Sequence, residues 1–314
     1  MAYPTIAGPY GLKPINEVGG LPYAGSTRMI PIQQGYTTNM YNGDVVQVGS
    51  AGNLIISSLA VPTTSQTTQT SVPATVGVLI GCEYSTSGGP IYGKNRYNAW
   101  LGSTNGAANI SDAVAYVVDD PNTVFKSAVL AQPAGAANTA TAITTIGYMS
   151  PAFIGTNVYY VSANGGVATT GNGTSLAGVC GNTPGASNGA GNIRITGGTG
   201  QTTGTPFRVV GVVPDTAVTV ATTLSSAASS TSLTVASTTG VYPGMQVIIP
   251  AATAGSGAVG YNTVVTQVTS STAVTVSASI TAASGAAVSF VGYQEVLVKW
   301  NYGFHGYTNA VSVA

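Results

Sequence analysis

Short, largely apolar runs rich in β-branched residues recur along the chain, each bounded by turn-forming residues. They lie at residues 29–32, 44–48, 53–56, 76–84, 113–118, 123–125, 157–161, 207–213 and 294–301. Runs of this length and composition are typical of β-strands buried on one or both faces. No window keeps the i, i+3, i+4, i+7 spacing of a long amphipathic helix, so the pattern predicts an all-β fold.

The composition changes between the last two runs, because residues 216–294 contain no charged side chain. Further short strands are expected there, at 231–235, 245–249, 264–268 and 272–276. We therefore predict a small β-sandwich-like domain at 217–290, inserted into a loop of the main β domain. That main domain spans 31–216 and is completed by 291–314. A long insertion at a loop tip costs little additional closure entropy.

Residues 1–30 have the composition of an extended arm. Repeated prolines and glycines interrupt any helix or strand, while tyrosines and leucines supply apolar contact area. Two interpretations remain open: the arm packs on a neighbouring molecule, where tyrosine is a favoured contact residue, or it wraps its own domain.

Charge is scarce in this chain of 314 residues. Lys and Arg total 8, Asp and Glu total 8, and only 5% of residues are charged, against about 25% in a typical soluble domain. This excludes nucleic-acid binding by phosphate neutralisation. The mean hydropathy of +0.30 argues against disorder. Near-zero net charge favours association, and a charge-poor β protein must close its sheets or pair their edges. We expect a barrel-like or sandwich-like main domain that works within an assembly.

The sequence offers little for catalysis. A Ser-His-Asp triad would have to use His305, the only histidine, and no G-x-S-x-G elbow is present. The eight acids show no pairing typical of a glycosidase. The glycine-rich stretch at 197–200 lacks the Lys-Ser/Thr of a phosphate loop. We predict that the protein is not an enzyme and binds no cofactor.

Metal and membrane sites are equally unsupported. Cys82, Cys180 and His305 are too few and too far apart for a zinc site, and two free thiols are expected rather than a disulfide. Asp119 and Asp120 precede Pro121, a pattern that favours a polar turn over a calcium site. Lys94 and Arg96 alternate with tyrosines, which favours a solvated hairpin or an interface rim over nucleic-acid stacking. Neither an export signal nor an apolar run long enough for a membrane helix is visible.

Several segments resemble structural proteins of marine tailed phages. These segments are Met1-Ala2-Tyr3-Pro4, Tyr10-Gly11-Leu12-Lys13-Pro14, Ile30-Pro31-Ile32, Gly35-Tyr36, Gly43-Asp44-Val45-Val46, Gly77-Val78-Leu79-Ile80-Gly81-Cys82, Ala115-Tyr116-Val117-Val118-Asp119-Asp120-Pro121 and Val296-Leu297-Val298-Lys299. The Gly-Asp-Val-Val pattern is also similar to that of small capsid decoration, or cement, proteins. The long Gly/Asn/Ser region at 163–200 and the insertion depart from a minimal cement domain.

The resemblance implies a decoration protein on the outer capsid surface of a virion. Its partners would be the phage major capsid protein and further copies of itself, with a homotrimer favoured. The residues expected at such an interface are Tyr3, Tyr10, Leu12, Tyr23, Trp300, Phe304 and Tyr307. Two alternatives stay open: a tail or fibre protein whose insertion reads a receptor or glycan, and a non-phage surface-layer or sheath protein. A major capsid protein is disfavoured because no long spine helix is expected.

Overall fold

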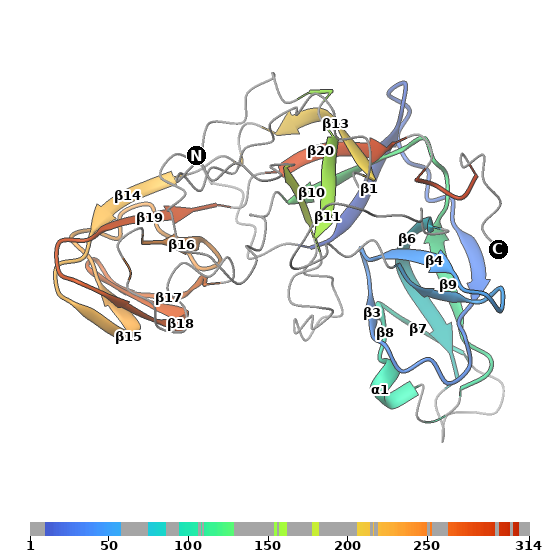
Figure 1. Ribbon diagram of the computed structural model, residues 1–314, viewed down its shortest axis with the longest axis horizontal. Coiled ribbons are helices and arrows are strands. Elements are labelled where there is room, and N and C mark those ends of the chain that lie inside the picture. Colours follow the sequence, from blue (N-terminus) through green and yellow to red (C-terminus); the bar gives the residue numbers. More distant parts are fainter. Residues whose placement is uncertain are drawn as a thin grey trace.

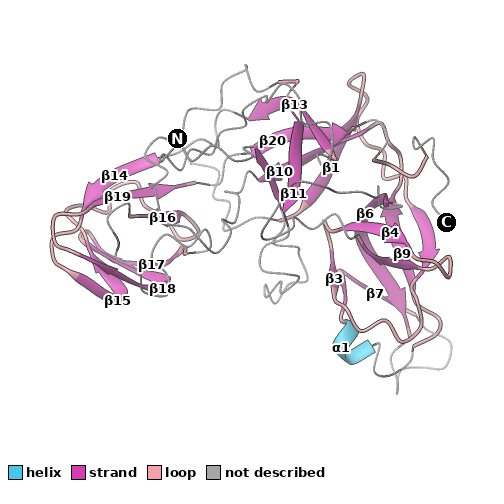
Figure 2. Cartoon of the chain, viewed as in Figure 1, coloured by secondary structure: helices cyan, strands magenta, loops and turns pink. Residues whose placement is uncertain are grey.

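The computed structural model describes residues 10–57, 75–85, 94–105, 108, 110–128, 154–155, 157–161, 178–181, 206–213, 216, 219–249, 252, 263–292, 295–301 and 304–307. The described chain is built from antiparallel strands, with one four-residue helix, α1 (Gly102–Asn105) (Figure 2). The all-β prediction is confirmed. Tyr3 lies outside the described residues, and so does the Gly/Asn/Ser region at 163–200 apart from residues 178–181.

The first large sheet brings together strands from both ends of the chain. Its order is β1 (Leu12–Glu17), β10 (Thr123–Ala128), β20 (Glu295–Trp300), β13 (Phe207–Val213), β11 (Asn157–Val161) and β12 (Gly178–Gly181). Every neighbouring pair is antiparallel. We call this sheet A.

The second large sheet, sheet B, curls into a small barrel. Its strands are β2 (Arg28–Pro31), β9 (Val114–Val118), β6 (Thr75–Tyr84), β4 (Val45–Val48) and β5 (Leu54–Ile56), with β7 (Asn95–Tyr97) beside β6. Ile32, just after β2, forms a parallel bridge with Leu54 of β5, which joins the two ends of the sheet. A short ribbon of β3 (Met40–Tyr41) and β8 (Ala99–Trp100) adds Met40 and Trp100 to the barrel core.

The central strands of sheet B, β6 and β9, contribute buried residues to both faces, which explains their long apolar runs. Leu79 and Val117 belong to the barrel core, whereas Val78 and Val118, their neighbours in sequence, pack with sheet A. Because successive strand residues point to opposite faces, alternate residues of β6 and β9 serve the two cores.

Residues 219–291 form a separate module, seen at the left of Figure 1. One of its sheets contains β14 (Thr219–Thr223), β19 (Ala287–Val291) and β16 (Gln246–Ile248), and the other contains β15 (Ala228–Thr234), β18 (Ala273–Ala282) and β17 (Val265–Ser270). The buried cluster of this module draws only on residues between Val220 and Phe290. It shares no residue with the other two clusters.

Hydrogen bonds close the module at both seams between its sheets. At one seam, Val247 N–H donates to the Thr263 carbonyl (2.9 Å), beside the start of β17. At the other, Ala236 N–H donates to the Thr223 carbonyl (2.9 Å), and Leu224 bridges Val235. These links shorten the free strand edges, which matters because the module has no charged residues to guard them.

The module is inserted into a β-hairpin. β13 and β20 flank it in sequence and pair directly with each other, with Val213 opposite Glu295 at the junction. The chain therefore leaves sheet A after Val213, forms the module, and re-enters sheet A at Glu295, opposite Val213.

The described part of the predicted N-terminal arm bears on the two interpretations that were left open for it. Leu12–Glu17 is strand β1 of sheet A, paired with β10, and Leu12 is buried in the core. From Tyr10 onward the segment therefore wraps its own domain, which was the second interpretation.

Candidate interface surface

Two glycines bring the N-terminal segment against the barrel. Gly11 and Gly43 have positive φ angles (78° and 96°), and a Cβ on Gly11 would lie 2.5 Å from the Gly43 carbonyl oxygen. Leu12 N–H donates to that same oxygen (3.0 Å), which links β1 to the turn before β4. The N-terminal segment crosses the barrel at this point, and the close approach of the two backbones requires glycine at both positions.

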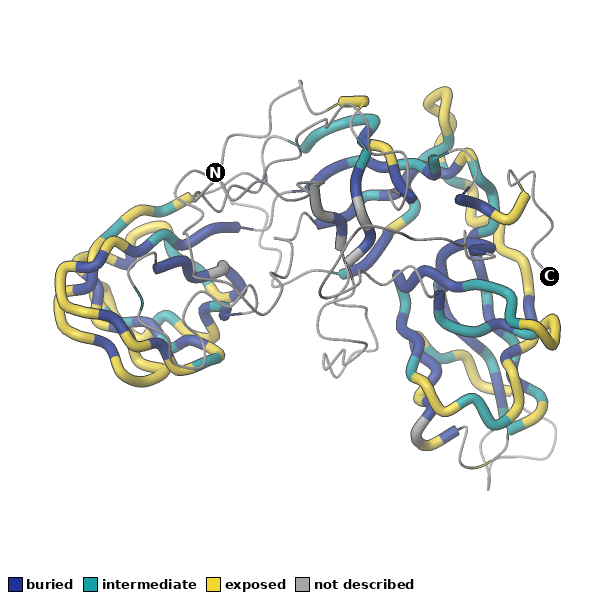
Figure 3. The backbone as a smooth tube through the Cα atoms, viewed as in Figure 1, coloured by how far each residue is buried: buried dark blue, intermediate teal, exposed yellow. Residues whose placement is uncertain are grey.

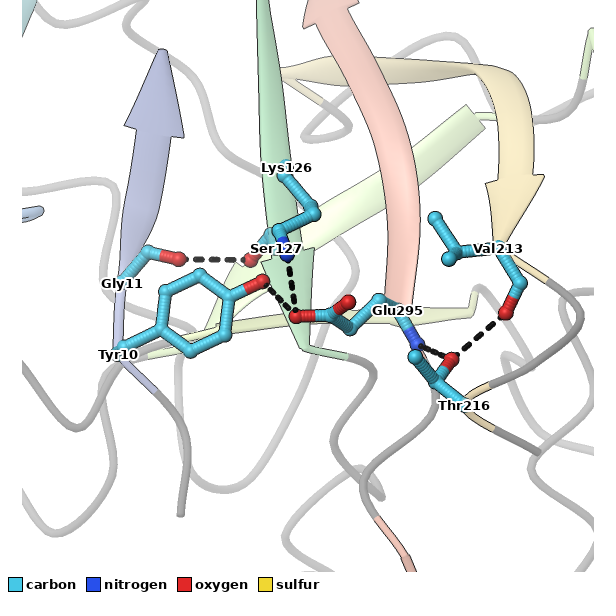
Figure 4. A network of polar contacts seen from close by, with 7 residues as sticks. All are labelled: Tyr10, Gly11, Lys126, Ser127, Val213, Thr216 and Glu295. Atoms are coloured by element: carbon cyan, nitrogen blue, oxygen red, sulfur yellow. Dashed lines mark hydrogen bonds and ion pairs between the residues drawn. The ribbon is translucent and has the colours of Figure 1, made fainter. Parts of the chain in front are cut away.

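A buried carboxylate organises the base of the inserted module (Figure 4). Glu295 Oε1 accepts a hydrogen bond from the Tyr10 hydroxyl (2.5 Å) and pairs with Lys126 Nζ (3.1 Å). Glu295 N–H donates to Thr216 Oγ1 (2.8 Å), which itself donates to the Val213 carbonyl (2.7 Å). The outgoing chain, the returning chain and the N-terminal segment are thus held at one point.

This network has the electrostatics of a structural lock. Burial, followed by the hydrogen bond to the Glu295 carboxylate and its charge, raises the pKa of Tyr10 far above its usual range. Lys126 also lies near the Tyr10 ring, 5.8 Å from its centroid. A buried carboxylate needs this cation and these donors, because an unpaired buried charge is strongly destabilising. The site holds the N-terminal segment and both ends of the module together.

The C-terminal segment 304–307 lies against the barrel. Gly306 N–H donates to the Thr75 carbonyl (2.7 Å), and Thr75 Oγ1 donates to the Phe304 carbonyl. His305 is fully buried, with its ring edge-on to Trp300 at 5.4 Å between centroids. His305 is therefore a core residue.

Beyond His305 the segment reaches an exposed polar cluster. The Tyr307 hydroxyl donates to Asp119 Oδ2 (2.7 Å) and accepts from Arg28 Nη1. Arg28 also pairs with Asp119 at 3.6 Å. Asp120, the next residue, accepts the backbone N–H of Asn122 (2.8 Å), so the predicted polar turn is confirmed.

Exposed apolar side chains lie beside this cluster. The turn between β1 and β2 carries Val18 and Leu21, which are 49% and 65% exposed. Val18 N–H donates to the Asn122 carbonyl (2.9 Å), so this turn is fastened to the β9–β10 turn that contains Asp119. Figure 3 shows the exposed tip of the β1–β2 segment at the upper right. We define the seam surface as Val18, Leu21, Arg28, Asp119 and Tyr307.

Three of the seven predicted interface residues are buried. Leu12, Trp300 and Phe304 are buried in the core shared by sheets A and B, so they stabilise this chain and offer nothing to a partner. Tyr10 is half-buried and bonded to Glu295, and Tyr23 packs against the same core.

Of the seven predicted residues, Tyr307 alone is described as exposed; it is joined at the seam surface by residues that the sequence analysis did not select. Leu21 is one of the leucines expected to supply apolar contact area in the N-terminal segment, whereas Val18 carried no signal, because single apolar residues in turns are ordinary.

The remaining candidate residues have structural surroundings. Arg96 lies over the Tyr116 ring (4.2 Å) and within 4.0 Å of Glu83. Cys82 is a free thiol inside the barrel, and the side chain of Cys180 lies outside the described set. Within the described ranges, no three His, Cys, Asp or Glu side chains come together to hold a metal. In those ranges no helix is long and apolar enough to cross a membrane.

Comparison with known proteins adds no relative. No protein-family model, curated protein or solved structure matches this chain.

Proposed function

We propose that this chain is a virion structural protein that decorates the outer face of a phage capsid and stabilises the lattice. The observation that carries the proposal is the seam surface, where the exposed turn with Val18 and Leu21 is bonded to the turn of Asp119, which contacts Arg28 and Tyr307. Aromatic, apolar and arginine side chains of this kind are enriched at the centre of protein interfaces, where lysine and glutamate are depleted.

Two further features support an assembly role. Only 5% of the chain's residues are charged and its net charge is zero, so there is little electrostatic repulsion between neighbouring molecules. Its N-terminal residues 1–9 continue from Tyr10, which is anchored to Glu295, so a partner's grip on them would act on a fixed point. A protein that binds only the assembled lattice stabilises it by mass action.

Cryo-EM of virions that contain this chain tests the proposal. We expect density for the chain on the outer capsid surface, with the seam surface against the major capsid protein or against a second copy. Density confined to the tail, or particles that lack the chain, would overturn it.

A binding assay gives the matched control. Leu21→Asp should weaken binding of the purified chain to capsids that lack it by at least tenfold, because it places a charge in the apolar part of the contact. Thr231→Asp, an exposed change in β15 of the module, should leave capsid binding unchanged. Both positions are exposed, so both variants should fold.

A tail or fibre protein with a receptor-reading module is the second candidate. It is favoured by the closed module at 219–291, whose core is independent of the rest of the chain. Glycan-array binding by the full chain that is lost when the module is deleted would favour this alternative.

A further inference from the structure

The C-terminal segment is fastened through a buried histidine whose hydrogen bond has a defined polarity. Tyr307 N–H donates to His305 Nδ1 at 3.3 Å. In this contact Nδ1 is the acceptor, so the neutral imidazole that fits it has its proton on Nε2. A hydrogen bond to the Val76 backbone also involves this ring.

Protonation of His305 conflicts with this arrangement. A proton on Nδ1 would turn the acceptor into a donor that faces the Tyr307 N–H. It would also place a charge in a fully buried site, against the edge of Trp300. Both effects oppose the docked position of Tyr307.

The charged and titratable groups around the site act in both directions. Burial is the largest influence and lowers the pKa of His305, while the Val76 backbone and the carboxylates of Asp119 and Asp120 raise it. Arg28 reaches the cluster through Tyr307 and adds positive charge. The net effect favours the neutral ring in the docked state.

We propose that residues 304–307 form an acid-released latch: protonation of His305 detaches Tyr307 from Asp119 and Arg28 and so remodels the seam surface. This goes beyond the decoration role, since the latch depends only on contacts within one chain. Because the released histidine binds a proton more tightly than the docked one, acid shifts the equilibrium toward release. Docking is strongest above the ordinary histidine pKa of 6.5 and weakens as the pH falls below it.

Hydrogen exchange on the full chain tests the latch. The amide of Gly306 reports it directly, because its hydrogen bond to the Thr75 carbonyl exists only while the segment is docked. After correction for intrinsic exchange rates, the opening constant should rise about tenfold per pH unit below 6.5, until the pKa of the docked histidine is reached. The amide of Val247, in the separate module, should show no such slope.

Two variants separate the latch from general instability. His305→Phe keeps a buried ring and should abolish the pH slope at Gly306. Tyr307→Phe keeps the histidine and the backbone contact, so its opening constant should be higher at every pH with the slope retained. An unchanged slope in His305→Phe, or a flat profile in the wild-type chain, would overturn the proposal. If His305→Phe does not fold, the wild-type profile and Tyr307→Phe still decide it.

Discussion

The separate cores predict that the inserted module and the rest of the chain unfold independently. Phe290 is the probe for the module, because it is fully buried at the centre of β19, between Val220 of β14 and Val247 of β16. Phe207 is its match in sheet A, also fully buried, with its ring 4.4 Å from that of Trp300. Each phenylalanine lies in one hydrophobic cluster only.

The size of the effect follows from burial and module size. Replacing a buried phenylalanine by alanine costs about 3–5 kcal/mol, from lost transfer energy and the cavity left behind. A module of about 70 residues has an unfolding entropy near its midpoint of roughly 0.15 kcal/mol/K. Phe290→Ala should therefore lower the Tm of the module by about 20 °C or more.

Differential scanning calorimetry of the full chain measures both transitions. Phe290→Ala should move only the module transition, and Phe207→Ala only the other. The reasoning fails if either variant shifts both transitions equally, or if the wild-type chain unfolds in a single cooperative step.

Three further outcomes are expected. In chemical unfolding of the main unit, Gly43→Ala should cost at least about 3 kcal/mol, because its Cβ would lie 2.6 Å from the Tyr10 carbonyl oxygen. Gly52→Ala, also at positive φ but in open space, should cost about 1 kcal/mol. If the two substitutions cost the same, the close approach of Gly43 to the Tyr10 backbone would not be what makes Gly43 necessary. Tyr10→Phe should cost about 1–3 kcal/mol in the same assay by removing a donor to buried Glu295. Since the pKa of Tyr10 is raised, the wild-type chain should lose stability as pH rises above 10, less steeply in Tyr10→Phe. Burial raises the pKa of the Cys82 thiol to about 12, so iodoacetamide at pH 8 should label Cys82 only after unfolding. Cys82→Ser should lack this unfolding-dependent label.

The hydrophobic pattern was sufficient to predict those strands that have a continuous apolar run. β6 and β9 were predictable because both of their faces are buried, so almost every position is apolar. β14, with the sequence Thr-Val-Ala-Thr-Thr, was not predicted, because its outward positions are small and polar and only its pairing with β19 defines it.

β1 was missed for a different reason. Its Pro14 signals a break, yet an edge strand tolerates proline because one side of the ladder needs no N–H. β1 lies at the edge of sheet A, and its register with β10 shifts between Pro14 and Asn16. Edge position is a tertiary property that local sequence does not contain.

The interface residues were predicted from their residue type, without regard to which face of a strand each side chain lies on. In β20 the alternation of Val296, Val298 and Trp300 with Leu297 and Lys299 already places Trp300 on the core side, and the structure agrees. Glu295 shows the limit of that rule, because its carboxylate is buried through contacts with Tyr10 and Lys126 from distant parts of the chain.

The phage-like motifs have mainly structural roles. Tyr10-Gly11-Leu12 and Gly43-Asp44-Val45 meet at the crossing of the N-terminal segment and the barrel, where Leu12 N–H bonds the Gly43 carbonyl. Asp44 Oδ2 accepts the Tyr41 N–H (2.8 Å) and so caps the turn that presents Gly43. Such residues are constrained by backbone geometry whatever the protein binds.

Among the motif residues that the structure describes, only Asp119 belongs to the seam surface. The resemblance therefore bears on the architecture of sheets A and B, and under the proposed function the partner contact depends on side chains outside it, above all Val18 and Leu21. A chain that keeps both glycines of the crossing but carries charged residues at these two positions should have the same fold and fail to bind the same partner. Circular dichroism and capsid binding of a Val18→Lys, Leu21→Asp double variant separate the two properties. Loss of both together would show that these side chains stabilise the fold, and retention of both would remove the seam surface as the interface.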